Sequence, residues 1–186
     1  MSTKNVRWPH AIARRVAEEL LAALEPCCER IAIAGSLRRG KPDVGDIELV
    51  YVPRTGQMRK PGELFPQRSE LADEIIDRWL ADGTLRKRPN VNGVTSWSPQ
   101  NKLAVHWSGI PVDLFATTKE RWFVALVVRT GSKETNTALA YAAQQRGMRL
   151  HVYGLLEGAD GQPIIPQSEQ EVFERCGVPY CEPERR

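Results

Sequence analysis

The stretch from residue 31 to residue 48 constrains this chain more than any other, because it sets two carboxylates close behind a glycine turn. Residues 31–34 are a short apolar run of the kind that forms a buried strand. A Gly35-Ser36 turn and a basic loop follow, and acidic and apolar residues then alternate from Asp46 onward. Since strand side chains alternate between two faces, Asp46 and Glu48 are predicted on one face, roughly 7 Å apart along the chain.

This arrangement indicates chemistry on metal ions and phosphate. Two carboxylates on one strand can converge on cations between them, and unpaired buried carboxylates are costly without such cations. Backbone N–H groups at Gly35 and Ser36, with Arg39 nearby, can hold an anion beside the ions. A polar face on an edge strand would give the same alternation, but it would leave the glycine turn and the basic loop unexplained.

A second pair of strands supplies a third acid. Residues 103–107 and 110–115 are apolar segments on either side of Ser108-Gly109, which predicts a hairpin. On its second strand Val112 and Leu114 share one face, and Asp113 points to the other. An aspartate on the surface would fit the same pattern, but beside Asp46 and Glu48 we interpret Asp113 as a third ligand.

Length and composition are those of an ordinary globular protein. The 186 residues suit one domain or two small lobes with a real core, and 26% of them are charged. The net charge is only +3, but the basic residues gather in clusters, which matters more than the total for binding phosphate. No run approaches the roughly 18 apolar residues of a membrane span, and the first ten residues lack the apolar core of a signal peptide. We therefore expect a cytoplasmic protein.

The four cysteines do not have the spacing of a zinc site. They occur as a Cys27-Cys28 pair and as Cys176 and Cys181, and the three histidines are scattered. We expect reduced thiols, while a disulfide between Cys176 and Cys181 stays open.

Helical periodicity occurs in several places along the chain. Apolar stripes predict helices over residues 9–25, 70–81 and 133–146, with Ser69 and Ser132 as N-caps of the last two. Residues 53–66, rich in Pro, Gly and basic residues, indicate a loop. Residues 121–128 fit either a helix or a buried strand, and the pattern does not decide between them. Residues 150–153 and 162–166 are predicted to pair as strands, and the last residues are expected to be polar and extended.

The motif G-S-L-R-R-G-K-x-x-x-G-D-I-E at residues 35–48 resembles the signature of the nucleotidyltransferase superfamily, and most closely DNA polymerase family X, the polymerase beta group. R-T-G-S-K-E-T-N-T-A-L-A at residues 129–140 and R-G-M-R-L-H-V-Y-G-L at 146–155 resemble the thumb of that family. The resemblance implies an α+β fold, with a nucleotidyltransferase palm (a mixed sheet flanked by helices) over residues 1–119 and a small α+β thumb over 120–186. Other members carry lyase and fingers domains that do not fit before Ile31, so a minimal member is expected.

The resemblance also implies roles for individual residues. Asp46, Glu48 and Asp113 match the catalytic acids that bind two Mg²⁺ ions, and Mn²⁺ should also fit. Glu48 stands where the family usually has aspartate. The nucleotide-binding positions of the family correspond to Gly35, Ser36, Arg39, Gly45, Gly131, Lys133 and Asn136. Its aromatic pair at the sugar corresponds to Val128 and Arg129, which suggests weaker selection against ribose.

The function that these features imply is that of a polymerase of the beta type, which adds nucleotides to a primer 3′-hydroxyl and fills short gaps in repair. Its partners would be DNA and nucleoside triphosphates, and the protein is expected to be a monomer. The DNA contacts are predicted at the basic residues Arg86, Lys87, Arg88, Arg146 and Arg149. One alternative is a template-independent nucleotidyltransferase that acts on a small molecule, a protein or an RNA end. Another is a nucleic-acid-binding module without activity, against which the three acids argue.

Overall fold

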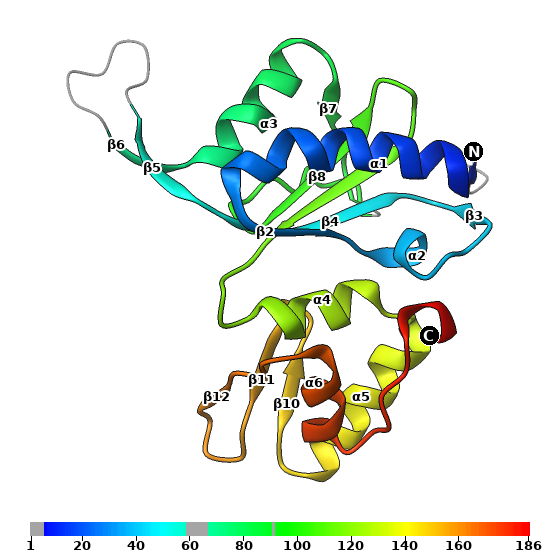
Figure 1. Cartoon of the computed structure of the whole chain (residues 1–186), viewed down its shortest axis with the longest axis vertical. Coiled ribbons are helices and arrows are strands. Elements are labelled where there is room, and N and C mark those ends of the chain that lie inside the picture. The colour runs from blue at the N-terminus through cyan, green and yellow to red at the C-terminus, as the bar shows by residue number, and fades with distance from the viewer. Residues whose placement is uncertain (1–5, 59–66, 91) are drawn as a thin grey trace.

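The computed structural model describes residues 6–58, 67–90 and 92–186, and it has a mixed α+β architecture (Figure 1). Its centre is a five-stranded sheet with the order β2-β4-β9-β8-β7. Strands β4 and β9 run parallel, and the other neighbours are antiparallel. The strands are β2 (Cys28–Ile33), β4 (Ile47–Pro53), β7 (Leu85–Lys87), β8 (Asn101–His106) and β9 (Pro111–Ala116). The predicted mixed sheet flanked by helices is therefore confirmed.

Helices α1 (His10–Leu24) and α3 (Leu71–Ala81) cover one face of this sheet (Figure 1). Their buried side chains, such as Leu20 and Ile76, form one core with Ile47, Leu49 and Leu114 from the strands. These strand residues are two apart or in register, so the alternating residues Glu48 and Asp113 are left for the opposite face. We call residues 6–116 the sheet part.

The second half of the chain lies below that opposite face (Figure 1). We call residues 122–186 the C-terminal part. It contains three helices and a small antiparallel sheet of order β10-β11-β12. These elements are α4 (Trp122–Thr130), α5 (Lys133–Gln145), β10 (Arg149–His151), β11 (Leu155–Glu157), β12 (Pro163–Ile164) and α6 (Glu169–Cys176).

Helix α4 joins the two parts, and it settles the ambiguity over residues 121–128 in favour of a helix. One side of α4, with Trp122, Ala125 and Leu126, packs on Val50 and Phe115 of the sheet. Its other side, with Val124 and Val127, enters the core of the C-terminal part. Because α4 is buried on both sides, it shows no clear amphipathic stripe, and so periodicity alone could not identify it.

Several short elements complete the chain. They are β1 (Trp8–Pro9), the 3₁₀ turn η1 (Glu25–Cys27), α2 (Gly35–Arg38), β3 (Asp43–Val44), β5 (Thr55–Met58), β6 (Gln67–Glu70) and η2 (Pro183–Arg185). Strand β1 pairs with β3, and β5 pairs with β6. In the described part of the chain, no helix is both long enough and apolar enough to span a membrane.

Several local expectations are wrong. The N-cap of α3 is Glu70, not Ser69, and α2 replaces the predicted turn after Gly35. Residues 55–58 of the expected loop at 53–66 form β5, which pairs with β6 directly after that range, while residues 59–66 lie outside the described residues. Strand β10 pairs with β11, which follows after only three residues, and β12 then pairs with β11. The tail is not extended, because it forms η2 and buries Arg186.

Other details agree with the sequence. The Ser132 side chain accepts a hydrogen bond from the backbone N–H of Thr135, so it is the N-cap of α5. All four cysteines are free thiols, as expected for a reducing environment.

Candidate active site

Glu48 and Asp113 are directly paired neighbours on strands β4 and β9. Both side chains lie on the face of the sheet opposite α1 and α3. Helix α4 packs on the same face, farther along the strands, against Val50 and Phe115. Asp113 is 9% exposed, and Glu48 is half-buried. Asp46 lies immediately before β4 rather than within it, and its side chain is also half-buried. The structure thus gathers the three predicted acids around the start of two parallel strands.

Gly35 gives the Glu48 carboxylate its place. The backbone of Gly35 has φ +63°, which favours glycine, and a Cβ there would lie 1.9 Å from Oε2 of Glu48. The adjacent Ala34 N–H donates to the Glu48 carbonyl at 2.8 Å, so the glycine turn is fixed against β4. The Gly-Ser turn and the acids therefore form one site, as the motif predicts.

Burial is the main influence on these carboxyl groups. It raises the pKa of Glu48 to about 8, with further contributions from the negative charges of Asp46 and Asp113. Burial likewise raises the pKa of Asp113 to about 6, although Arg88 opposes the increase. The pKa of Asp46 is raised in the same way. The three carboxyl groups thus form a partly buried cluster, and the nearby positive charges do not fully offset the cost of ionising them.

Arg88 supplies some of that charge, in a place where DNA binding was predicted. Its Nη2 donates to Oδ1 of Asp113, and its Nε donates to the carbonyl of Ala104 at 3.2 Å. The guanidinium is 23% exposed and directed to the acid rather than to solvent. Arg88 is thus a partner of Asp113 in the structure, and its contact with DNA stays a prediction.

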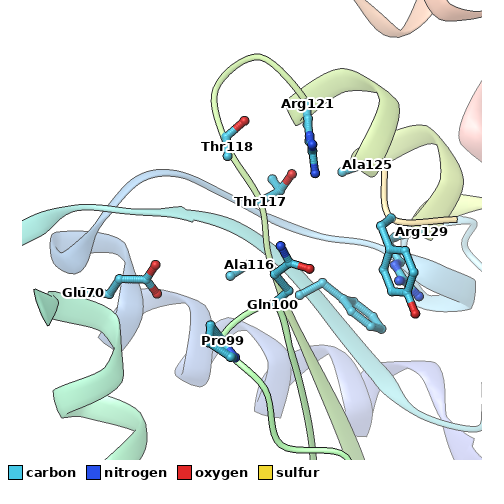
Figure 2. Close-up of a pocket in the computed structure, with 11 residues that line it drawn as sticks. Glu70, Pro99, Gln100, Ala116, Thr117, Thr118, Arg121, Ala125 and Arg129 are labelled. Atoms are coloured by element: carbon cyan, nitrogen blue, oxygen red, sulfur yellow. The ribbon is translucent and has the colours of Figure 1, made fainter. Parts of the chain in front are cut away.

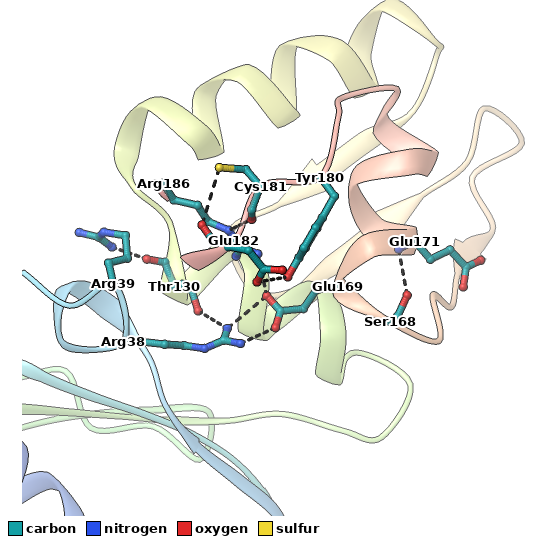
Figure 3. A network of polar contacts seen from close by, with 10 residues as sticks. All are labelled: Arg38, Arg39, Thr130, Ser168, Glu169, Glu171, Tyr180, Cys181, Glu182 and Arg186. Carbon is teal, nitrogen blue, oxygen red and sulfur yellow. Dashed lines mark hydrogen bonds and ion pairs between the residues drawn. The ribbon is translucent and has the colours of Figure 1, made fainter. Parts of the chain in front are cut away.

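The basic loop joins the sheet part to the C-terminal part (Figure 3). Arg39, predicted as a triphosphate contact, donates to the carbonyl of Thr130. Arg38 donates to the Thr130 hydroxyl at 2.8 Å and to both oxygens of Glu169, and Arg186 lies 3.0 Å from the same carboxylate. These contacts hold the end of α4 and the start of α6 against the glycine turn.

Arg129 brings a positive charge from α4 toward the acids. Its guanidinium carbon lies 3.6 Å above the centroid of the Phe115 ring, within the range of a cation–π contact. Its charge interacts with Glu48 and Asp113, and burial lowers its pKa. The Arg129 side chain is half-buried.

The other predicted nucleotide contacts lie at the turn between α4 and α5. Gly131 has φ +44°, and the Asn136 side chain donates across this turn to the Val128 carbonyl at 2.7 Å. Lys133 is exposed at the start of α5, and Ser36 and Gly45 are half-buried near the acids. Whether these groups contact a nucleotide stays a prediction.

The remaining basic residues are exposed, but they differ in whether they also contact other residues of the chain. Arg86, on the edge strand β7, and Arg149, on β10, are exposed, and Arg149 also lines an open groove of about 500 Å³ between α5 and the small sheet. Lys87 is exposed but lies 4.6 Å from the Trp97 ring centroid. The Arg146 guanidinium covers Gly177, where a Cβ would collide with it. Arg146 is therefore engaged in packing as well.

Oxygen ligands from carboxylates suit Mg²⁺ and Mn²⁺, so the three acids fit a divalent metal in their chemistry. Burial raises the pKa values of all three acids, and a bound cation would stabilise their ionised forms. However, among the residues that the structure describes, no group of three acids, histidines or cysteines is already arranged around a metal position. The hydrogen bond from Arg88 uses only one of the lone pairs of the Asp113 carboxylate, so this group can still serve as a metal ligand.

The known proteins that this chain resembles are named as DNA polymerases or as DNA nucleotidylexotransferases. The DNA polymerase beta thumb family matches residues 125–186. The DNA polymerase/3′-5′ exonuclease PolX of Bacillus subtilis is 30% identical over 185 residues, which cover 97% of this chain and 28% of that protein. DNA polymerase lambda of Arabidopsis thaliana is 26% identical over 200 residues, covering 98% of this chain and 36% of the relative. The DNA nucleotidylexotransferase of Eulemur macaco is 36% identical over 189 residues, which cover 84% of this chain and 36% of that protein. The chain thus spans about a third of the length of these relatives.

The contacts that sequence reasoning missed are those between the two parts. Nothing in the spacing of Arg38, Thr130 and Glu169 shows that they meet, because they are separated by as many as 131 residues. The doubled arginine at 38–39 was the only hint, and it indicated phosphate binding.

Proposed function

Because the chain is a family X polymerase-like protein, we propose that it is a DNA polymerase that adds nucleotides to the 3′-hydroxyl of a DNA primer. The observation that carries the proposal is the pairing of Glu48 with Asp113 beside Gly35, with Asp46 at the mouth of the same strand. A repair role, the filling of short gaps, is part of this proposal.

Asp46, Glu48 and Asp113 would hold two divalent ions, Mg²⁺ or Mn²⁺. Such ions, when bound, lower the pKa of a hydroxyl nucleophile and offset negative charge on phosphate oxygens. The protein holds these acids close together and partly buried before any ion binds, so their positions are already set in the folded state. Arg88 would orient the Asp113 carboxylate through its hydrogen bond while the other lone pairs of that carboxylate face the ions.

The basic loop would receive the triphosphate. The backbone N–H groups around Ser36 and the guanidinium of Arg39 lie on the same side as the acids, and they can donate to phosphate oxygens. Because Arg39 also donates to the Thr130 carbonyl, its direction depends on the position of the C-terminal part. We further propose Gly131, Lys133 and Asn136 as contacts to the nucleotide.

Primer extension is the direct test. The protein, with Mg²⁺ or with Mn²⁺, is incubated with each of the four deoxynucleotides and a primer on a template, in a short gap or as a single strand. Addition of the nucleotide complementary to the template supports the proposal. No addition on any substrate, from a protein that is folded by circular dichroism, contradicts it.

A second candidate is nucleotide addition without a template. It is favoured by the relative named DNA nucleotidylexotransferase, which has the highest identity of the three compared. Extension of the single-stranded primer at the rate seen with the templated one would support this alternative.

A further inference from the structure

A cavity lies where the sheet part meets the C-terminal part (Figure 2). Its volume is about 200 Å³, several times the roughly 30 Å³ share of one water molecule in the liquid. One wall is formed by Gln100 and by Thr117 and Thr118, which follow β9. The other is formed by Arg121 and Arg129 of the α4 segment and by Tyr153 from the turn after β10.

The chemistry of the lining points to an anion. Figure 2 shows Arg121 directed from the start of α4 toward Thr117. Lys119, two residues earlier, forms an ion pair with Glu29 at 2.6 Å, but within the described residues the Arg121 side chain has no hydrogen-bond or ion-pair partner. The hydroxyl of Thr117 is buried and likewise lacks a hydrogen-bond partner there. Both donors thus face the cavity without a partner among the described protein groups, and for the buried Thr117 hydroxyl an unmade hydrogen bond costs free energy.

The charge around the cavity is uneven. Arg121 and Arg129 lie at the α4 end, and Glu70 lies on the opposite side, as Figure 2 shows. An anion would therefore be held at the arginine end, where the Thr117 and Thr118 hydroxyls and the Gln100 amide are also within the lining. Guanidinium forks and hydroxyl donors together are the groups that recognise tetrahedral oxyanions.

We propose that this cavity is a second phosphate-binding site, distinct from the acids and the glycine turn, in which Arg121 and Thr117 hold one phosphate group. The group is either free inorganic phosphate or a phosphodiester of DNA, since both present the same oxygens. Binding there links the two parts of the chain, because Thr117 and Arg121 belong to the connecting segment 117–121, while Gln100 of the sheet part and Arg129 of the C-terminal part line the same cavity. It also adds negative charge beside Arg129, whose charge already acts on Glu48 and Asp113.

Nuclear magnetic resonance of the full chain tests the site without any assay of activity. Inorganic phosphate, and separately a short single-stranded oligonucleotide, are titrated at constant ionic strength with chloride as the balancing ion. The side-chain Nε–H signal of Arg121 and the amide signal of Thr117 are followed. A saturable shift of both signals with either probe supports the site and identifies the source of the phosphate group. The absence of a saturable shift with both probes overturns it.

Three variants assign the binding to this cavity. Arg121→Gln should weaken binding, read at the Thr117 amide, at least tenfold, and Thr117→Val should weaken it by a smaller factor. Arg78→Gln, which changes an exposed arginine on α3 outside the cavity, should bind as the parent does. Arg39→Gln removes the proposed triphosphate contact and should also leave this site intact. Unchanged affinity in Arg121→Gln, or equal losses in Arg121→Gln and Arg39→Gln, would refute the proposal, while primer extension reports separately on the proposed polymerase.

Discussion

Arg88 donates a hydrogen bond to Asp113, so the guanidinium and the carboxylate form an ion pair inside the sheet face that carries the acids. The contact explains why burial raises the pKa of Asp113 only to about 6, whereas that of Glu48, which lacks such a partner, reaches about 8. The negative charge of the three acids is offset by arginines from four separate segments, which are Arg7, Arg39, Arg88 and Arg129.

The acids are the first target for substitution. Asp46→Asn and Asp113→Asn should each lower the rate of primer extension by about 10²-fold or more, since each removes a charge that the reaction needs. Glu48→Asp should keep measurable activity because it retains the carboxylate. Single-turnover extension with Mg²⁺ measures these effects, and thermal unfolding checks that the variants fold. Parent-like extension by Asp113→Asn would show that this acid is not a ligand.

The pH dependence of stability has a definite sign. In the metal-free folded protein the pKa of Glu48 is raised from 4.5 to about 8, so between these values the folded state binds more protons than the unfolded state. The free energy of unfolding should therefore fall as pH rises through this window, by a few kcal/mol. Urea unfolding in the presence of a chelator, at about pH 5 and pH 8, measures the fall.

Glu48→Gln is the control for this effect, because it removes the titrating group and should make the pH dependence shallower. Mg²⁺ should restore stability more at pH 8 than at pH 5, since only the ionised carboxylates bind it. An identical pH slope in the parent and in Glu48→Gln would contradict the interpretation.

The contact between Arg38 and Glu169 should stabilise the junction of the two parts. The side chains are 24% and 13% exposed, so the pair is shielded from solvent. In a double-mutant cycle with Arg38→Gln and Glu169→Gln we expect a coupling free energy of about 0.5–3 kcal/mol. The exposed pair of Arg14 and Glu18 on α1 is a matched control and should give less than about 0.5 kcal/mol. Equal coupling in the two pairs would mean that the junction gains nothing from this contact.

DNA binding should separate Arg86 and Lys87 from Arg88. Charge reversal in Arg86→Glu with Lys87→Glu is expected to weaken DNA binding and to reduce the slope of log affinity against log salt by about 1–2. Arg78→Glu, on a different surface, serves as the control. Fluorescence anisotropy with a labelled primer–template over a range of salt measures both quantities, and a slope unchanged from the parent would rule out a phosphate contact at β7.

Sugar selection tests the pair at Val128 and Arg129. Arg129 stacks on Phe115, and the Asn136 side chain donates to the Val128 carbonyl. We expect weak exclusion of ribose, about 10–200-fold, as for other small steric contacts. The double substitution Val128→Tyr with Arg129→Phe should strengthen the exclusion of ribose. The ratio of kcat/KM for dGTP and GTP opposite a template cytosine decides, and a parent ratio above about 10³ would argue that the backbone sets the exclusion.

The sequence by itself determined the local parts of this protein. The alternation from Asp46 to Val50, the hairpin before Asp113 and the glycine turn each follow from interactions within a few residues, because strand alternation and backbone sterics act at that range. The Ser132 cap is a contact of the same kind. From these features the mixed sheet and the proximity of the three acids were predictable, and the motifs around them carried the resemblance to family X polymerases.

Only the tertiary structure decided what the arginines do. Arg38 meets Glu169 across 131 residues, Arg88 meets Asp113, and Arg129 meets Phe115, and none of these pairs leaves a periodic signal in the chain. A long, flexible cationic side chain can serve DNA, a nucleotide or a carboxylate equally well in sequence terms. Which carboxylate an arginine pairs with depends on which carboxylate the packed core has buried close to it. Burial makes an unpaired charge costly, and an ion pair with a nearby arginine lowers that cost.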